Sequence, residues 1–231
     1  MKFSTILTTM ILMSGIVLAD HHAGSPFNGK DLKEWSTKKK SKGKDSWLVG
    51  IPTQSKENPK TLNAGEGDGA MINKVSGHGQ SWDIYSSKKW GGKFRIELEV
   101  MVPKGANSGI YVMGEYEVQV LDSYGKAKLG GGDMGAIYGA QPPKVNACKK
   151  PGEWQKYVID FQAPGYDEGG KKISNAKFIK VELNGQILHE NVEMKGPTPS
   201  GVTGKEAAKG PIMFQGDHGP VAYRNIKIKS I

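Results

Sequence analysis

The most informative segment of the sequence is Asn107-Ser-Gly-Ile-Tyr-Val-Met-Gly-Glu-Tyr-Glu-Val-Gln-Val-Leu-Asp122. It predicts a β-hairpin, with one strand, a glycine turn and a second strand. Because side chains alternate along a strand, Glu117 and Gln119 point to one face while Val118 and Val120 point to the other. The hairpin therefore predicts a sheet with one packed face and one face that presents polar groups to a ligand.

The rest of the chain has the short apolar runs, separated by Gly and Pro, that are typical of an all-β protein. Its 231 residues include 32 Gly and 12 Pro, which separate short apolar runs, and no apolar pattern has the period of a helix. Asn184-Gly185 predicts a two-residue hairpin turn, because both residues tolerate positive φ. We expect one two-sheet antiparallel β-sandwich with the following strands: Gly69–Asn73, Asp83–Ser86, Lys93–Val102, Gly109–Met113, Glu115–Asp122, Trp154–Phe161, Ala176–Leu183, Gln186–His189, Pro211–Gln215 and Val221–Ser230.

Apolar side chains on the inward face of these strands should form the core. The clearest alternation is in Lys93–Val102. The residues expected to be buried are Ile96, Leu98, Val100, Val118, Val120, Ile179, Val181 and Ile226, and Trp82, Trp90 and Trp154 are further candidates for the core or a cleft.

The N-terminus has the pattern of a secretory signal peptide. Lys2 precedes an apolar run from Phe3 to Leu18, and small residues end it at Ala19. A membrane anchor is the alternative, but the run is short and contains several Ser and Thr residues. We expect a signal peptide at residues 1–19, export to the periplasm or the cell exterior, and one domain at 20–231 with its core at about 27–231.

The net charge of +9 comes from Lys far more than from Arg. Arg95 and Arg224 are the two arginines, whereas nucleic-acid readers use Arg for bidentate contacts. The densest basic run is Lys38-Lys39-Lys40, which lies among Ser and Gly and predicts a solvated loop. We expect no nucleic-acid partner, and no membrane anchor after signal cleavage.

Cysteine and histidine give little sign of redox or metal chemistry. Cys148 is the one cysteine, so an internal disulfide is excluded, and a small buried apolar role fits it better than a nucleophilic one. The segment Asp20-His21-His22 is either a disordered tail or a copper- or nickel-chelating end. No zinc-type spacing is present, and the sequence leaves any cofactor open.

Two groups of polar residues are candidates for chemistry. If Glu97, Glu99, Glu117 and Gln119 share a side, they form a polar stripe suited to sugars or acid–base work; a solvent-exposed outer face is the alternative.

The second group is Gln215-Gly-Asp-His-Gly-Pro220, followed by Tyr223-Arg-Asn225. His218 suits proton transfer near neutral pH, while a pairing with Asp217 cannot be assumed. Arg224 is either a structural ion pair or a ligand contact.

Seven short motifs, in order, resemble a known family. They are Phe27-Asn-Gly-Lys-Asp-Leu-Lys-Glu-Trp35, Asn107-Ser-Gly-Ile-Tyr111, Tyr116-Glu-Val-Gln-Val-Leu-Asp122, Gly135-Ala-Ile-Tyr-Gly139, Pro151-Gly-Glu-Trp154, Leu183-Asn-Gly185 and Tyr223-Arg-Asn-Ile226. Together they are similar to the 3-keto-disaccharide hydrolase, or 3-keto-glucoside lyase/hydratase, domain. The resemblance implies a concanavalin-like jelly roll.

The resemblance also implies a function. A secreted bacterial enzyme would cleave 3-keto-glycosides or 3-keto-disaccharides by elimination and hydration, a net hydrolysis of a small carbohydrate substrate. The alternative is a non-catalytic, lectin-like glycan-binding module of the same fold.

The motifs and the two polar groups together give the site prediction. Glu117 and His218 should share one cleft. The catalytic candidates are His218, Glu117 and Asp122, and the substrate-binding candidates are Asn107, Tyr111, Gln119, Tyr138, Gln215 and Arg224. One departure from the family is Met113, where many members carry Arg.

Overall fold

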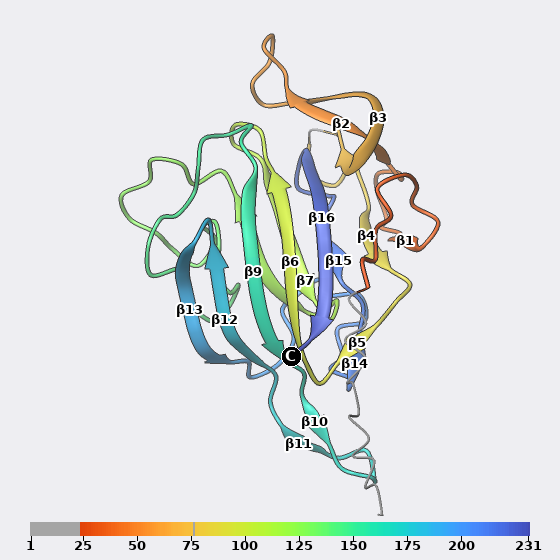
Figure 1. Ribbon diagram of the computed structural model, residues 1–231, viewed down its shortest axis with the longest axis vertical. Coiled ribbons are helices and arrows are strands. Elements are labelled where there is room, and N and C mark those ends of the chain that lie inside the picture. The colour runs from red at the N-terminus through yellow and green to blue at the C-terminus, as the bar shows by residue number, and fades with distance from the viewer. Residues whose placement is uncertain (1–23, 76) are drawn as a thin grey trace, which may run out of the picture.

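The structure is a computed structural model that describes residues 24–75 and 77–231. Two antiparallel sheets lie face to face (Figure 1). The five-stranded sheet has the order β1 (Trp35–Lys38), β4 (Asp83–Ser86), β15 (Met213–Phe214), β7 (Asn107–Val112) and β8 (Tyr116–Leu121). The seven-stranded sheet has the order β13 (Gln186–Glu193), β12 (Lys177–Leu183), β9 (Gln155–Gln162), β6 (Lys93–Met101), β16 (Val221–Ser230), β3 (Leu62–Asn73) and β2 (Trp47–Gln54).

Two short ribbons complete the described elements: β10 (Gly165–Tyr166) with β11 (Lys172–Ser174), and β5 (Trp90–Gly91) with β14 (Lys209–Gly210). The predicted all-β sandwich is confirmed. The signal peptide and the Asp20-His21-His22 segment lie outside the described residues. In the described part of the chain, no helix is long and apolar enough to cross a membrane.

The core fills the space between the two sheets. Val118 and Val120 from β8 and Ile96 and Leu98 from β6 belong to one buried cluster. Aromatic rings join the two layers: Phe214 of β15 stacks on Tyr223 of β16 with 3.9 Å between ring centres. Burial of this apolar surface is the main driving force that holds the sheets together.

One predicted core residue is wrong. Ile179 is only half-buried, while Phe178 and Val181 are fully buried. A β-bulge between Phe178 and Lys180 shifts the register against β9, so alternation does not carry through this point. The other seven predicted core residues are buried. The three tryptophans Trp82, Trp90 and Trp154 are half-buried.

The strand β2 was not predicted, and its position explains why. It contains Gly50 and Pro52, which weaken the strand pattern, and it lies at the edge of the seven-stranded sheet. Proline is tolerated at an edge because its missing N–H costs no ladder hydrogen bond there.

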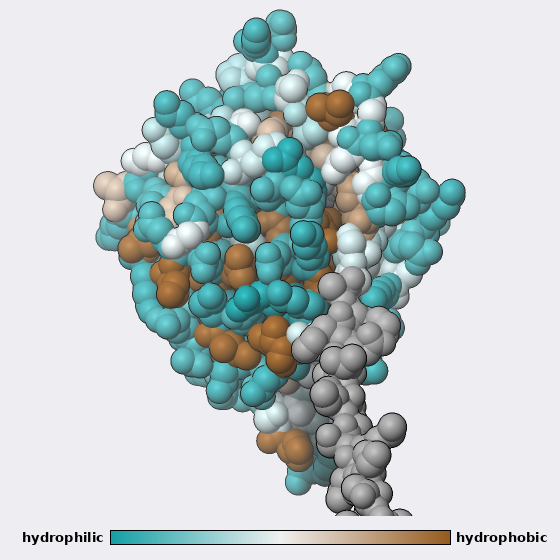
Figure 2. Space-filling view, in the orientation of Figure 1, coloured by the Kyte–Doolittle hydropathy of each residue, from teal (hydrophilic) through white to brown (hydrophobic). Residues whose placement is uncertain are grey.

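The outer face of the seven-stranded sheet is toward the viewer in Figures 1 and 2. Figure 2 shows hydrophilic side chains over most of this face, with separate apolar patches between them. The opposite layer, the five-stranded sheet, carries the candidate site.

Candidate active site

The β7–β8 hairpin forms the floor of a cavity on the outer side of the five-stranded sheet. Tyr111 is opposite Glu117 and Gly109 is opposite Gln119 in the antiparallel register. A Cβ at Gly109 would collide with the carboxylate of Glu117, so glycine at this position leaves the room that the carboxylate occupies. This close approach is a physical reason for the Asn-Ser-Gly sequence at the start of β7.

The cavity has a volume of about 220 Å³. Seven of the nine predicted site residues line it: Asn107, Tyr111, Glu117, Gln119, Tyr138, Gln215 and His218. Gly132, Pro199 and Ser200 complete the lining. The structure therefore brings Glu117 and His218 to one cavity, although they are 101 positions apart in the chain.

A loop at residues 198–204, here the cover loop, lies over the Glu117 side of the hairpin. Thr198 donates its N–H to the carbonyl of Glu115 at 2.8 Å, and its hydroxyl oxygen accepts from the N–H of Glu117 at 3.1 Å. Lys38 donates to the carbonyls of Ser200 and Gly201 at 2.8 and 2.5 Å. The cover loop is thus fixed to both β8 and β1, and it helps to exclude water from Glu117.

Burial controls the chemistry of Glu117. The side chain is 4% exposed, and Tyr111 donates its hydroxyl to Oε2 at 3.0 Å. Burial raises the pKa of Glu117 to about 7, with Asp83 and Asp217 acting in the same direction, while the Tyr111 hydrogen bond and His218 oppose the rise. A carboxyl group with this pKa can donate or accept a proton near neutral pH.

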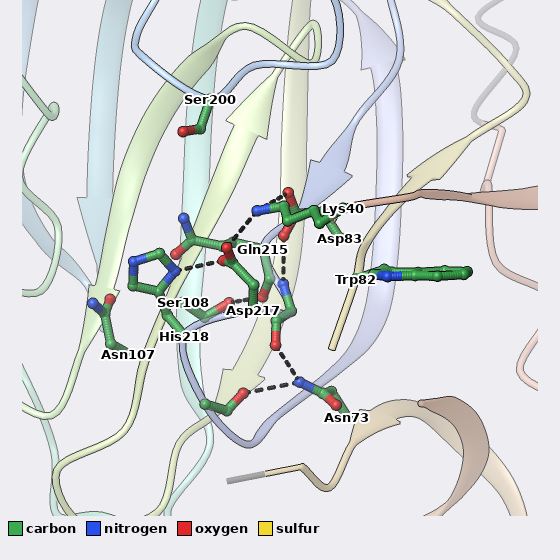
Figure 3. Close-up of polar contacts among 12 residues, drawn as sticks. Lys40, Asn73, Trp82, Asp83, Asn107, Ser108, Ser200, Gln215, Asp217 and His218 are labelled. Atoms are coloured by element: carbon green, nitrogen blue, oxygen red, sulfur yellow. Dashed lines mark hydrogen bonds and ion pairs between the residues drawn. The ribbon is translucent and has the colours of Figure 1, made fainter. Parts of the chain in front are cut away.

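His218 is oriented by a chain of charged groups (Figure 3). Its Nδ1 is 2.5 Å from Oδ1 of Asp217, whose Oδ2 is 2.5 Å from the ammonium of Lys40. The same ammonium is 2.9 Å from Oδ2 of Asp83. Burial opposes ionisation of Asp217, but the hydrogen bonds from His218 and Lys40 lower its pKa to about 2.

The ionised Asp217 accepts a hydrogen bond, so Nδ1 of His218 carries the proton of that bond. This leaves Nε2 as the nitrogen that can exchange a proton with a ligand. Figure 3 shows the second ring nitrogen on the side away from Asp217, where Asn107 lies.

The turn that carries His218 is itself fixed. Asn73 donates its amide to the carbonyls of Gly216 and Gly219 at 2.7 and 3.0 Å. The N–H of Gly216 donates to Oδ1 of Asp83 at 3.0 Å. Asp83 therefore holds both Lys40 and the backbone before His218, and the imidazole is positioned from two directions.

Amide side chains supply neutral hydrogen-bonding groups along the cavity. Gln119 donates its amide nitrogen to Oδ1 of Asn107 at 2.6 Å. This bond leaves the amide nitrogen of Asn107 and the carbonyl oxygen of Gln119 for a ligand, and Gln215 adds a second amide to the lining. Such groups match the hydroxyl and carbonyl oxygens of a sugar.

Two predicted site residues lie elsewhere. Asp122 accepts the N–H of Gly105 at 2.9 Å, and it lines a separate surface depression with Tyr124. Asp122 follows the end of β8, beyond the point where Glu117 and Gln119 face the cavity.

Arg224 is on the outer face of the seven-stranded sheet. Its Nε is 2.6 Å from Glu99, and its guanidinium carbon is 4.0 Å from the centre of the Trp154 ring. The alternation of β16 turns Tyr223 into the core and Arg224 away from it. The prediction that Arg224 lies near Glu117 is therefore wrong.

The contacts of Lys40 differ from those predicted from the sequence. The basic run was predicted to be a solvated loop, yet the Lys40 side chain is 21% exposed and bridges two carboxylates. Its neighbour Lys39 is exposed, and nothing in the sequence distinguishes the two. The pairing of Asp217 with His218 was likewise left open.

The departure at Met113 does not touch this cavity. Met113 is in the β7–β8 turn with φ 54°, and it lines another cavity, of about 310 Å³, with Glu115, Lys89 and Lys209. Within residues 24–75 and 77–231, no cluster of three or more His, Cys, Asp or Glu side chains is arranged to hold a metal ion.

Comparison with known proteins gives the family. A domain family described as "3-keto-alpha-glucoside-1,2-lyase-like domain" matches residues 22–229. A crystal structure from Parabacteroides distasonis, of a protein assigned provisionally as a glycosyl hydrolase, is similar with a TM-score of 0.63 and 29% identity, covering 90% of this chain and 84% of that chain.

A second structure from that organism, with the same provisional assignment, has a TM-score of 0.57 and 19% identity over 89% of this chain and 92% of its own, which supports the fold. A search of proteins with curated function finds no match. Because the family match covers nearly the whole chain, this protein belongs to the 3-keto-alpha-glucoside-1,2-lyase-like domain family.

Proposed function

We propose that this protein is an exported enzyme that cleaves 3-keto-glycosides by elimination followed by hydration. A ketone at C3 of the sugar makes the proton on C2 acidic. A base removes that proton, negative charge develops on the C3 oxygen, and the group on C1 leaves with its oxygen. Water then adds across the C1–C2 double bond, so the net result is hydrolysis.

One observation carries the proposal: a buried carboxyl group, Glu117, and an imidazole, His218, line one cavity. His218 acts as the base, since Asp217 holds Nδ1 and leaves Nε2 to accept the C2 proton. Glu117 acts as the acid that protonates the leaving oxygen, because burial raises its pKa to about 7 and keeps a fraction protonated.

Amide donors support the intermediate. The amide nitrogens of Asn107 and Gln215 can donate to the C3 oxygen as its charge develops. Fixed donors of this kind stabilise a transition state without reorganisation at the moment of reaction. The role of Lys40 is to position Asp217, and through it His218, rather than to contact the sugar.

The proposed export rests on the signal-like N-terminus, residues 1–19. Expression of the full chain in bacteria, followed by N-terminal sequencing of the periplasmic fraction, tests it. A mature chain that begins at Asp20 is expected, and an uncleaved chain retained in the cytoplasm contradicts the proposal.

The function is tested by incubating the mature protein with a 3-keto-glucoside and, in parallel, with the glucoside that has a hydroxyl at C3. We expect release of the leaving group from the 3-keto compound alone, because the C3 ketone is needed to acidify C2. Binding without release favours the glycan-binding module, and equal release from both compounds contradicts the elimination route.

A further inference from the structure

The size of the cavity limits what it can hold. Its volume of about 220 Å³ is below the roughly 300–1,000 Å³ of pockets that enclose drug-sized ligands. Tyr111 and Glu117, which line it, are 1% and 4% exposed. One sugar ring fills such a space, so the group attached to C1 has to lie at the mouth.

Tyr138 differs from the rest of this lining. Tyr138 is 42% exposed, although the adjacent Ile137 is fully buried. Tyrosine offers a flat apolar surface with a polar tip, and such a ring at the opening of a polar cavity is placed to stack against another ring.

The backbone beneath Tyr138 is held firmly. Its N–H donates to the carbonyl of Glu117 at 3.0 Å, and the carbonyl of Ala136 accepts the N–H of Gln119 at 2.9 Å. Gly135 packs so closely on Leu188 that a Cβ would collide with it. The Gly135-Ala-Ile-Tyr-Gly139 motif therefore attaches an exposed ring to the same strand that carries Glu117, which reduces the ordering cost of binding.

We infer that Tyr138 forms a leaving-group subsite that takes a ring with an apolar face, either an aromatic group or a second pyranose. The inference rests on the proposed function, since it assumes that the keto-sugar occupies the cavity. It adds that the enzyme prefers glycosides with a ring on C1 to those with a small alkyl group.

Binding alone tests the subsite, with compounds that cannot be turned over. Methyl glucoside, phenyl glucoside and a glucosyl-glucose disaccharide of one anomeric configuration, none oxidised at C3, are titrated by NMR into the wild type and four variants. We expect phenyl glucoside to bind about 3- to 10-fold more tightly than methyl glucoside to the wild type, as ring stacking adds to burial.

The variants test whether the preference for phenyl glucoside over methyl glucoside depends on the Tyr138 ring. Tyr138→Ala should abolish it, while Tyr138→Phe and Tyr138→Trp should retain it. Tyr124→Ala is the matched control, because Tyr124 is 50% exposed but lines a different depression. A preference for the disaccharide as well identifies a pyranose-accepting subsite; a preference for the phenyl compound alone identifies an aromatic one.

Two results overturn the inference: equal affinity of the wild type for all three compounds, or an unchanged preference in Tyr138→Ala. Failure of the proposed function is seen separately. A protein that shows the Tyr138-dependent preference but releases nothing from a 3-keto-glucoside keeps the subsite and loses the enzymatic role.

Discussion

The outer faces of the two sheets carry glutamates in similar strand patterns, yet their environments differ. Glu97 and Glu99 on β6 are half-buried on an open face and pair with Lys229 and Arg224. Glu117 on β8 is buried and receives a hydrogen bond from a neutral tyrosine. The pattern Glu-x-Glu or Glu-x-Gln therefore identifies an outward face, and the segments that cover that face decide whether it becomes reactive.

The covering segments come from distant parts of the chain. The cover loop lies over Glu117, and His218, near the C-terminal end of the sequence, lines the same cavity. Lys40, near the other end, contacts Asp217, which in turn holds His218. A carboxylate without a cation, removed from water, holds its proton more strongly. The ion pairs on the open face of the seven-stranded sheet, Glu97–Lys229 and Glu99–Arg224, add little to stability. Ion pairs open to solvent typically contribute below about 1 kcal/mol to the free energy of unfolding.

The largest expected effect is at His218. His218→Ala should lower turnover by about 10²-fold or more while the protein stays folded, because it removes the proposed base. Steady-state release from a 3-keto-glucoside measures this, and circular dichroism checks the fold. His78→Ala is the control: His78 is exposed, with its ring centre 4.4 Å from that of His218, and its loss should change turnover by a few-fold at most.

The buried carboxyl group of Glu117 should make the stability of the protein depend on pH. Its folded pKa of about 7 is above the ordinary value of 4.5, so the native state binds more protons than the unfolded state between these pH values. Its contribution to stability is therefore fully present below pH 4.5 and is lost as pH rises through about 7. The full cost of ionising it is roughly 3 kcal/mol.

Urea unfolding at pH 4.5 and pH 8 measures this cost. In Glu117→Gln the loss of stability from pH 4.5 to pH 8 should be smaller than in the wild type by roughly 3 kcal/mol. Identical pH dependence in the two proteins would show that Glu117 has an ordinary pKa. The variant should also release the leaving group at least about 10²-fold more slowly, because it has no acid to protonate the leaving oxygen.

Substitution of Lys40 tests whether this distant residue positions the imidazole of His218. Lys40→Met should reduce kcat by about 10-fold with little change in KM and should alter the pH profile of kcat, because Asp217 loses its cation and His218 loses its fixed orientation. Lys40→Arg should recover part of the loss. Lys39→Met is the control, since Lys39 is exposed; an equal effect of both Met substitutions contradicts a specific role.

The smallest expected effect is on the open face. Glu99→Gln weakens the contact with Arg224 but leaves the contact between the Arg224 guanidinium and the Trp154 ring. We expect a loss of less than about 1 kcal/mol in unfolding free energy and no change in turnover. A loss of turnover comparable to that of Glu117→Gln would mean that the two faces are functionally coupled.

Local patterns predicted much of the fold. Alternation identified β6, β8 and β16, because each has one apolar face toward the core. It failed at Ile179, where a bulge resets the alternation, and at β2, where edge position permits Gly50 and Pro52. Bulges and edges depend on the neighbouring strands, which the local sequence does not specify.

The candidate site was predictable where it follows the strand pattern. Glu117 and Gln119 share a face of β8, and the structure places both at the cavity. The predicted position of Arg224 was wrong, because the type of a residue indicates what its side chain can bind but not which of the two sheets contains it. Lys40 was missed because its partners, Asp83 and Asp217, are brought to it only by the folded topology.

Elimination requires that the proton on C2 is removed during cleavage. The most direct measurement is cleavage of a 3-keto-glucoside in D₂O, with NMR of the released sugar and an enzyme-free sample to correct for spontaneous exchange. We expect solvent deuterium at C2 of the product at the rate of leaving-group release, and the loss of both signals in His218→Ala. Release of the leaving group with the original proton retained at C2 would contradict elimination.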